Sequence, residues 1–384
     1  MGAVQKISLG LLALAPLSWL AVGLDWGDAA VCLTAVGSIM GLAIWMSQAT
    51  EELGVALGPS IGSLLNAVFG NATELILALA ALRAGLVTIV KASITGSLIG
   101  NLLLTLGLAM LAGGIGRREQ RFRPVVARVS GTAMSLAVLA MLIPSLASLG
   151  VHPSDSLEAA RSTASFSRFV AWLLLLVYGL TLLFSLRTHR NLYQLLEEEP
   201  EASPDRDQAD AAAHDTAPSA HASGARPSLR LWLTVLLGAA ALLAVESELF
   251  MGVIEPVSER LHLPASFTGI VLLPLLGGLP EYVTAVGLAR RNKMHLSVSV
   301  AFGCTLLVAL LMVPVLVLCG PLLGHPFDLS FDVYEVVAVI SAVVISNLVS
   351  LDGRSDWLEG VLLLGAYGIL AAGFWYQATP ALPI

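Results

Sequence analysis

Long apolar stretches follow one another from one end of the chain to the other, separated by short polar segments. Most hold about 20 residues, which is enough for a helix to cross a hydrocarbon core roughly 30 Å thick. The first run is longer than the apolar part of a signal peptide and is interpreted as a span. The pattern predicts eleven membrane-spanning helices, at 6–24, 28–46, 58–82, 87–113, 125–148, 166–186, 230–250, 266–289, 295–319, 332–350 and 358–377.

The composition agrees with an all-α polytopic membrane protein. The chain is 57% apolar and only 12% charged, whereas about a quarter of the residues of a soluble protein are charged. Cys32, Cys304 and Cys319 lie in apolar runs at unrelated spacings, which argues against a disulfide framework or a zinc site. The chain has no His-Glu-x-x-His pair and no P-loop. We therefore expect no enzyme, no bound cofactor and no nucleic-acid partner, but a protein whose contacts are lipid and transported ions.

The basic residues predict the orientation. Eleven spans place three basic loops and Lys6 on one side of the membrane, and the positive-inside rule assigns that side to the cytoplasm. The N-terminus is then cytoplasmic and the C-terminus outside, which we place in a cell inner membrane. The residues of the three loops are Arg117, Arg118, Arg121 and Arg123, then Arg187 and Arg190, then Arg290, Arg291 and Lys293.

One long polar segment, 191–228, divides the chain. It opens with four glutamates between 197 and 201 and continues rich in Ala, Asp, Ser and Pro. We interpret it as an acidic cytoplasmic linker, with a regulatory segment that senses cation or pH as the alternative. The organisation is then a leading helix (1–27), a first five-helix repeat (28–190), this linker and a second five-helix repeat (229–384).

The two halves align without a gap at an offset of 207 residues. Because five spans is an odd number, the second copy enters the membrane from the opposite side. This is the inverted-repeat plan of secondary transporters, whose sites lie near the midplane where broken helices meet. The aligned pairs are Gly62 and Gly269, Gly70 and Gly277, Glu74 and Glu281, Ala78 and Ala285, Gly96 and Gly303, and Gly113 and Gly320.

Glu74 and Glu281 are the candidate cation and proton ligands. Each lies inside an apolar span, where a carboxylate is costly and therefore usually functional. Gly70 and Asn71 precede Glu74, and Gly277, Gly278 and Pro280 precede Glu281. Glycine and proline weaken a helix, so we expect unwound turns whose carbonyl oxygens suit hard cations such as Ca²⁺. Two carboxylates are neutral with one divalent cation or with two protons, and this predicts antiport.

A second pair of acids lies at the edges of the preceding spans. Thr50-Glu51-Glu52 closes the second span, and Glu246-Ser247-Glu248 closes the seventh. The hydroxyl-then-glutamate pattern appears once in each half. Glu51 and Glu248 are either vestibule acids that attract or relay cations, or interfacial glutamates that contact headgroups and water.

The stretch 49–114, which includes GPSIGSLLNAVFGNATELI and ITGSLIGNLLLTLG, closely resembles the first conserved repeat of calcium/proton exchangers, the CAX branch of the calcium/cation antiporter superfamily. ESELFMGVIEP, FTGIVLLPLLGG, ARRNKM and LDGRSDWLEGVLLLGAY fit the later half. The resemblance implies an eleven-span fold and an antiporter that exchanges a cation, Ca²⁺ by preference, for protons by alternating access. By motif position it implies that Asn71, Glu74 and Glu281 bind the cation and that Asn101 lines the flanking helix.

The second half departs from the family pattern. Where the family reads Gly-Asn-Ala-Ala-Glu-His, this chain has Gly278 in place of the asparagine and Tyr282 in place of the histidine. The family's glutamine is replaced by Leu307. Each change removes an oxygen ligand or a proton-handling group. Two alternatives therefore stay open, a monovalent Na⁺ or K⁺/proton antiporter and a cation sensor without transport. The sequence defines neither the stoichiometry nor the oligomeric state.

Overall fold

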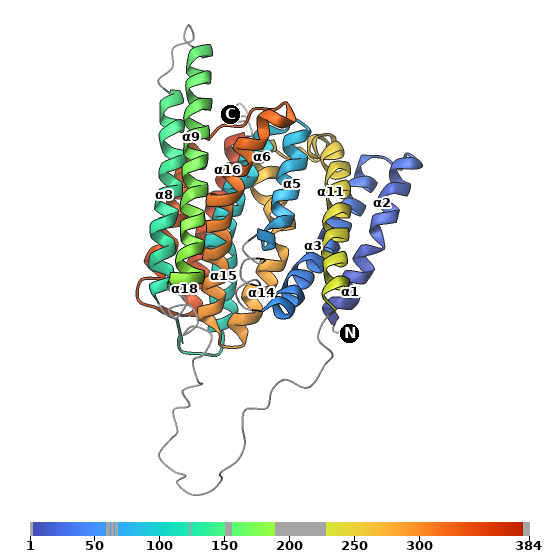
Figure 1. Ribbon diagram of the computed structural model, residues 1–384. Helices are drawn as coiled ribbons and strands as arrows, with labels where there is room; N and C mark the ends of the chain where they lie inside the picture. Colours follow the sequence, from blue (N-terminus) through green and yellow to red (C-terminus); the bar gives the residue numbers. More distant parts are fainter. Residues whose placement is uncertain are drawn as a thin grey trace, which may run out of the picture.

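The computed structural model describes residues 3–58, 62, 65, 68–122, 124–149, 156–188 and 228–378. Nearly all of this part of the chain is helical, and the helices run roughly side by side between two ends of the molecule (Figure 1). The expected all-α fold is confirmed. Most of the linker predicted at 191–228 lies outside the described residues.

The first half contains two leading helices and a chain of longer ones. The bounds are α1 Ala3–Leu12, α2 Leu14–Gly23, α3 Asp28–Leu57, α5 Ala72–Arg83, α6 Val87–Ile99, α7 Leu106–Gly114, α8 Pro124–Leu149 and α9 Ser156–Leu183. A π-helical segment, η1 (Gly100–Thr105), joins α6 to α7, and a second, η3 (Phe184–Thr188), ends α9.

The second half is interrupted more often. Its helices are α11 Leu229–Arg260, α12 Ala265–Phe267, α13 Leu273–Gly277, α14 Leu279–Arg290, α15 Met294–Leu307, α16 Val313–Cys319, α17 Val333–Val349 and α18 Trp357–Ala378. The π-helical segments η4 (Thr268–Leu272) and η5 (Val308–Met312) and the 3-10 helix η6 (Gly320–Leu323) lie between them. Two short strands, β1 (Gln120–Arg121) and β2 (Arg354–Ser355), pair antiparallel.

Seven of the described helices are long and apolar enough to cross a membrane, and an eighth is formed if the bent pair 265–277 and 279–290 counts as one span. Helical segments lie within each of the eleven predicted ranges. The count of eleven spans stays a prediction, because α2 and α17 are short and residues 59–67 are mostly outside the described part of the chain.

The structure departs from two of the predicted ranges. The first predicted span, 6–24, holds α1 and α2, which form one apolar stretch with helical backbone angles at Ala13. The ring of Pro16 accounts for the interruption because it displaces the carbonyl of Leu12 four residues earlier. The second, 28–46, continues as α3 to Leu57 and ends only at Gly58, whose φ of 87° a residue with a side chain rarely adopts. The hydropathy falls at Gln48, but a helix does not need apolar residues to continue.

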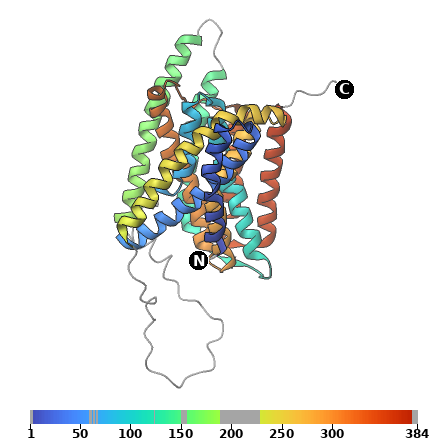
Figure 2. The same ribbon diagram turned by 90° about the vertical axis from the view of Figure 1, so that its right-hand side faces the viewer.

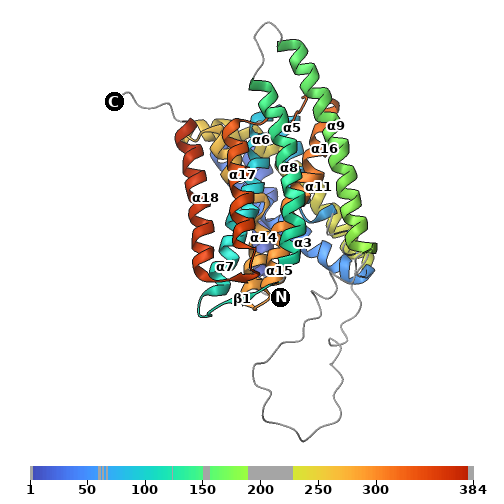
Figure 3. The same cartoon turned by 90° about the vertical axis from the view of Figure 1, so that its left-hand side faces the viewer.

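The helices α3 and α11 pack along each other, and α1 and α2 cover α3 on the outer side. In Figure 2 these four helices lie together, with α11 and α3 inclined to the remaining helices. On the opposite side, α18 packs on α7 and α17 packs on α8 (Figure 3). The short helices α5, α13 and α14 pack on the first group through α11 or α3, and α14 also packs on α7.

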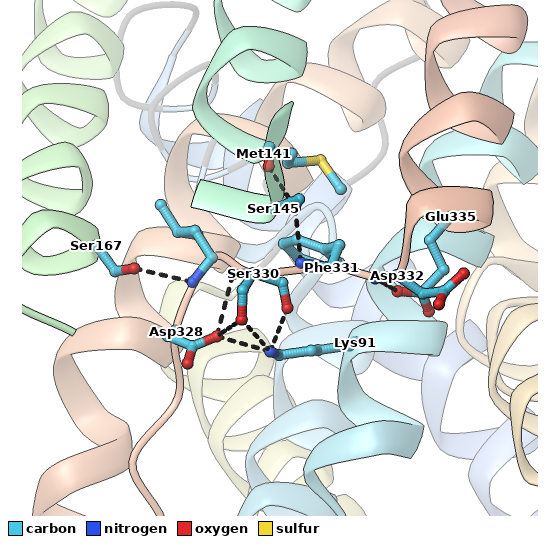
Figure 4. A network of polar contacts seen from close by, with 10 residues as sticks. Lys91, Met141, Ser145, Ser167, Asp328, Ser330, Phe331, Asp332 and Glu335 are labelled. Carbon is cyan, nitrogen blue, oxygen red and sulfur yellow. Dashed lines mark hydrogen bonds and ion pairs between the residues drawn. The ribbon is translucent and has the colours of Figure 1, made fainter. Parts of the chain in front are cut away.

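A loop at one end of the molecule ties the two halves together (Figure 4). Lys91 on α6 forms an ion pair with Asp328 at 2.7 Å and donates to the carbonyl of Ser330. Burial raises the pKa of the Asp328 carboxyl, but Lys91 and the hydrogen bonds of Ser330 outweigh it, so the pKa lies below its usual range. The backbone amides of Leu329 and Phe331 donate to serine hydroxyls at 3.0 and 2.8 Å; the two hydroxyls are those of Ser167 on α9 and Ser145 on α8.

Candidate functional site

Glu74 lies at a break in the first half. The chain turns at Gly70 and Asn71, and α5 begins at Ala72, so that Glu74 is in the first turn of the new helix. Its side chain is buried. The carboxyl accepts hydrogen bonds from the amide of Asn71 at 2.9 Å and from the hydroxyl of Ser97 at 3.1 Å. The local helix break and the flanking helix α6 together fix the position of this carboxyl.

Glu281 has the equivalent place in the second half. The helical segments 265–277 and 279–290 are bent by 60° at Gly278, and Glu281 is in the first turn of α14. Pro280 also lies in that first turn, where a missing N–H leaves no intrahelical hydrogen bond unmade. The Oε2 atom of Glu281 is buried and has no hydrogen-bond partner among the described residues. The second carboxyl is therefore left with an unused oxygen.

The two breaks meet. Gly277, at the end of α13, lies against Glu74, and a Cβ at this glycine would come within 2.8 Å of Glu74 Cγ. The carboxyls of Glu74 and Glu281 are close enough to interact electrostatically. Because the Glu74 side chain and the Oε2 atom of Glu281 are buried and the like charges repel, the two carboxyls are stable together only when protons or a cation neutralise them. The structure thus brings together the two glutamates that the sequence predicted as a pair.

The asparagines lie around this pair. Asn71 donates to Glu74, and its own Oδ1 is buried without a hydrogen-bond partner in the described part of the chain. Asn101 is buried in η1, one helical turn after Ser97, and its amide nitrogen is likewise unpartnered. Residues four apart share one face of a helix, so Asn101 follows Ser97 on the face that meets Glu74. The structure gives no direct bond between Asn101 and either carboxyl.

Three further residues complete the surroundings of the carboxyls. Ser97 and Cys304 are related by the same offset, 304 − 97 = 207, and Cys304 is close enough to both glutamates to interact with them electrostatically. Tyr282 is buried, and its hydroxyl donates to the carbonyl of Pro274 at 3.1 Å. Neither Ser97 nor Cys304 was predicted as a site residue. Applying the repeat offset to the helices that follow the glutamates would have found both.

The vestibule acids are not part of this cluster. Glu51 is exposed on α3, inside the helix rather than at its end as predicted. Glu248 on α11 forms an ion pair at 2.6 Å with Arg83 at the end of α5, and both side chains are more than half exposed. Glu248 therefore links α11 to α5 at the surface. A role of either residue in attracting cations stays a prediction.

The site offers oxygen atoms rather than a preformed metal cage. The described residues contain no cluster of three or more His, Cys, Asp and Glu side chains that could hold a metal ion. What they contain is the carboxyl pair, the unpartnered Oδ1 of Asn71 and the hydroxyl of Ser97. Carboxylate, amide and hydroxyl oxygens are the ligands of hard cations, which complete their shells with water or backbone carbonyls. This chemistry suits a cation that binds and leaves.

Comparison with known proteins gives the family. The model of the sodium/calcium exchanger protein family matches residues 28–187 and 231–376, that is, both halves of the chain. The chain belongs to this family. The predicted resemblance to the calcium/proton exchanger branch is confirmed by relatives. A Ca²⁺/H⁺ antiporter of Aphanothece halophytica is 44% identical over 380 residues, which cover 99% of this chain and 98% of the relative. The Ca²⁺/H⁺ antiporter ChaA of Bacillus subtilis is 36% identical over 94% of this exchanger and 95% of its own length.

Solved structures agree with the fold of this exchanger. The structure of native YfkE is 31% identical and has a TM-score of 0.78, covering 96% of this chain and all of its own. The H⁺/Ca²⁺ exchanger CAX has a TM-score of 0.65 at 15% identity, covering 98% of this exchanger and 93% of its own chain. The second likeness concerns the fold alone.

Proposed function

We propose that this exchanger is a Ca²⁺/H⁺ antiporter that works by alternating access, with Glu74 and Glu281 as the shared cation and proton site. The observation that carries the proposal is the meeting of two buried carboxyls at two helix breaks, one from each half of the chain. The relatives named as Ca²⁺/H⁺ antiporters support the choice of ions.

Charge balance is the basis of the exchange. One Ca²⁺ neutralises two carboxylates, and so do two protons. Either load makes the site neutral, whereas the bare anions carry a large desolvation cost in a membrane-spanning bundle. The protein therefore switches easily between its inward-open and outward-open states when Ca²⁺ or two protons are bound. The switch is difficult when the site is empty. This coupling gives about two protons for each divalent cation.

The number of available oxygen ligands supports Ca²⁺ over a monovalent cation. Ca²⁺ takes six to eight oxygens, and the unpartnered oxygens of Asn71 and Glu281 are available beside the remaining carboxyl oxygens. The second half lacks an asparagine at Gly278, so water or backbone carbonyls complete the shell. A monovalent cation needs fewer ligands, and it is the alternative that the same geometry admits.

The architecture proposed for this function is a leading span and two inverted repeats of five spans, with a cytoplasmic N-terminus in a cell inner membrane. The start of α1 and the basic loop that contains β1 lie at the same end of the molecule (Figure 3), as the positive-inside rule requires. Large apolar side chains point outward along the long helices, among them Leu176, Leu180, Ile369 and Leu362. They support a surface that contacts lipid.

Everted membrane vesicles test the ion and the direction. An established pH gradient is monitored by a quenched dye while Ca²⁺, Na⁺, K⁺ or Mn²⁺ is added in turn. We expect Ca²⁺ to collapse the gradient. Collapse by Na⁺ or K⁺ alone selects the monovalent antiporter, and no response to any cation favours a sensor without transport.

Substitution tests the site in the same vesicles. Glu74→Gln and Glu281→Gln each keep the side-chain shape but cannot alternate between charged and protonated forms, and we expect either to abolish exchange. Glu51→Gln, on an exposed carboxyl of the same bundle, should only weaken it. Near-normal exchange by both former variants would remove the assignment of the site.

A further inference from the structure

A third buried carboxyl lies outside the carboxyl pair, in the middle of α11. Glu246 is 0% exposed, although the sequence pointed instead to its neighbour Glu248. The two residues are two positions apart on one helix and therefore face nearly opposite directions. Glu248 faces Arg83 of α5 at the surface, whereas Glu246 faces the leading helix α2. Glu246 thus belongs to a different interface from the pair.

The groups that face Glu246 are all neutral. They are the hydroxyl of Ser18 and the side chain of Trp19 on α2, and the hydroxyl of Ser38 on α3. None of the ion pairs found among the described residues includes Glu246. A carboxylate buried in a spanning helix without a cation costs several kcal/mol. Some other species has to neutralise it.

The hydrogens around Ser18 favour a proton. A serine hydroxyl has a single hydrogen to donate. Ser18 Oγ lies 2.7 Å from the carbonyl of Ala15 and 2.9 Å from each carboxyl oxygen of Glu246. If the hydroxyl donates to the carbonyl, the contact with Glu246 has a hydrogen only when the carboxyl is protonated and donates to Ser18. A protonated Glu246 completes a chain from carboxyl to hydroxyl to carbonyl, and every member is satisfied.

Ser38 completes the arrangement from α3. Its side chain is wholly buried near the Glu246 carboxyl, and its Oγ has no hydrogen-bond partner among the described residues. The Ser38 hydroxyl is therefore an unused donor next to the carboxyl. A carboxylic acid with one donor and one acceptor beside it has what it needs when buried.

We propose that Glu246 is a proton-binding site, separate from the transport pair, that joins the leading helix α2 to α11 while its carboxyl is protonated. Loss of the proton would leave a buried charge between α2, α3 and α11 with no cation to pair with it. The contact would then open to water. The site exists whichever cation the exchanger carries, because none of its groups belongs to the carboxyl pair.

Infrared spectroscopy tests proton occupancy without any transport. The background is the purified triple variant Glu74→Gln, Glu281→Gln, Glu335→Gln, which removes the carboxyl pair and the buried carboxyl of Glu335 on α17. We expect its spectrum at neutral pH to show a protonated carboxyl band that disappears on adding Glu246→Gln and persists with the control Glu248→Gln. Absence of the band would overturn the proposal. Loss of the band on adding Na⁺ at constant pH would also overturn it, because Glu246 would then bind a cation instead of a proton.

Thermal unfolding tests the link between the proton and the helix contact. Glutamine keeps a neutral side chain at every pH. The melting temperature of the unmodified protein should therefore fall more steeply than that of Glu246→Gln as the pH rises from about 4.3, the value of an unfolded glutamate, towards the alkaline side. If the difference in melting temperature between the two proteins does not change with pH, Glu246 has only a structural role. Failure of Ca²⁺/H⁺ exchange in vesicles would leave both measurements standing, so the two proposals fail separately.

Discussion

Gly277 lies directly against the side chain of Glu74, with only 2.8 Å between Glu74 Cγ and the place where a Cβ of residue 277 would be. The glycine belongs to the second half of the chain and the glutamate to the first. Their contact is how two helix breaks come to share one site.

Replacing this glycine should therefore damage transport. In Gly277→Ala the added methyl group collides with Glu74, and such overpacking costs about 1–3 kcal/mol. We expect the rate of exchange in vesicles to fall about tenfold or more. Gly287→Ala, on the following helix α14 and with nothing within 4 Å of an added Cβ, is the matched control. Equal rates for the two variants would show that the closeness of Gly277 to Glu74 has no role in transport.

A hydroxyl in place of the Cys304 thiol should improve cation binding. Cys304 lies by both glutamates at the position that corresponds to Ser97, whose hydroxyl donates to Glu74. Cys304→Ser exchanges sulfur for an oxygen ligand worth about 1 kcal/mol, so the Ca²⁺ concentration for half-maximal exchange should fall about fivefold. Cys319→Ser, at the end of α16, should leave it unchanged. An increase in that concentration for Cys304→Ser would contradict the expectation.

The ion pair between Lys91 and Asp328 should stabilise the protein in a pH-dependent way. The folded pKa of Asp328 lies below its usual value, so its contribution is present above the unfolded value of about 3.9 and is lost as the pH falls through the folded pKa. We expect Asp328→Asn to lower the melting temperature at neutral pH by about 2 °C, since both side chains are partly exposed.

The pH dependence separates this pair from a merely local contact. The difference in melting temperature between the unmodified protein and Asp328→Asn should shrink in acid. Arg260→Gln, which breaks the exposed pair of Arg260 with Asp28, serves as the control for a surface ion pair. A difference for Asp328→Asn that stays constant from neutral to acid pH would exclude the ion pair as its cause.

The exposed pair of Arg83 and Glu248 should act on cation entry through its charge. Removing a surface carboxylate lowers the local attraction for Ca²⁺, and this effect is screened by salt. We expect Glu248→Gln to raise the half-maximal Ca²⁺ concentration at low ionic strength and to have little effect at high ionic strength. A change of equal size at both ionic strengths would indicate a direct ligand instead.

The pairing of Glu74 with Glu281 could be predicted from the sequence because two signals agree there. Each of the two glutamates lies in an apolar run, and the repeat offset of 207 residues relates one to the other. Glu246 could not be predicted in this way. Hydropathy indicates how deep a residue lies in the membrane but not the direction in which its side chain points. The packing of α2 against α3 and α11 is what buries Glu246 and leaves Glu248 exposed.

The end of α3 shows a second limit of sequence reasoning. Apolar residues stop near Gln48, but backbone hydrogen bonds continue to Leu57 because no residue before Gly58 breaks them. Likewise, a single apolar run at 6–24 contains two helices because of one proline. Membrane burial and helix continuity are separate properties, and hydropathy predicts only the first.

The great length of α3 and α11 has a consequence for the surrounding lipid. With 30 and 32 residues, these helices measure about 45 and 48 Å, against a hydrocarbon thickness of roughly 30 Å. Such helices either extend beyond the hydrocarbon layer at their polar ends or cross it at an angle, and Figure 2 shows both inclined to the remaining helices. A mismatch between helix length and bilayer thickness changes the tilt of such helices. The acyl-chain length of the host membrane should therefore affect the angle at which α3 and α11, the two helices that flank the ion site, cross each other.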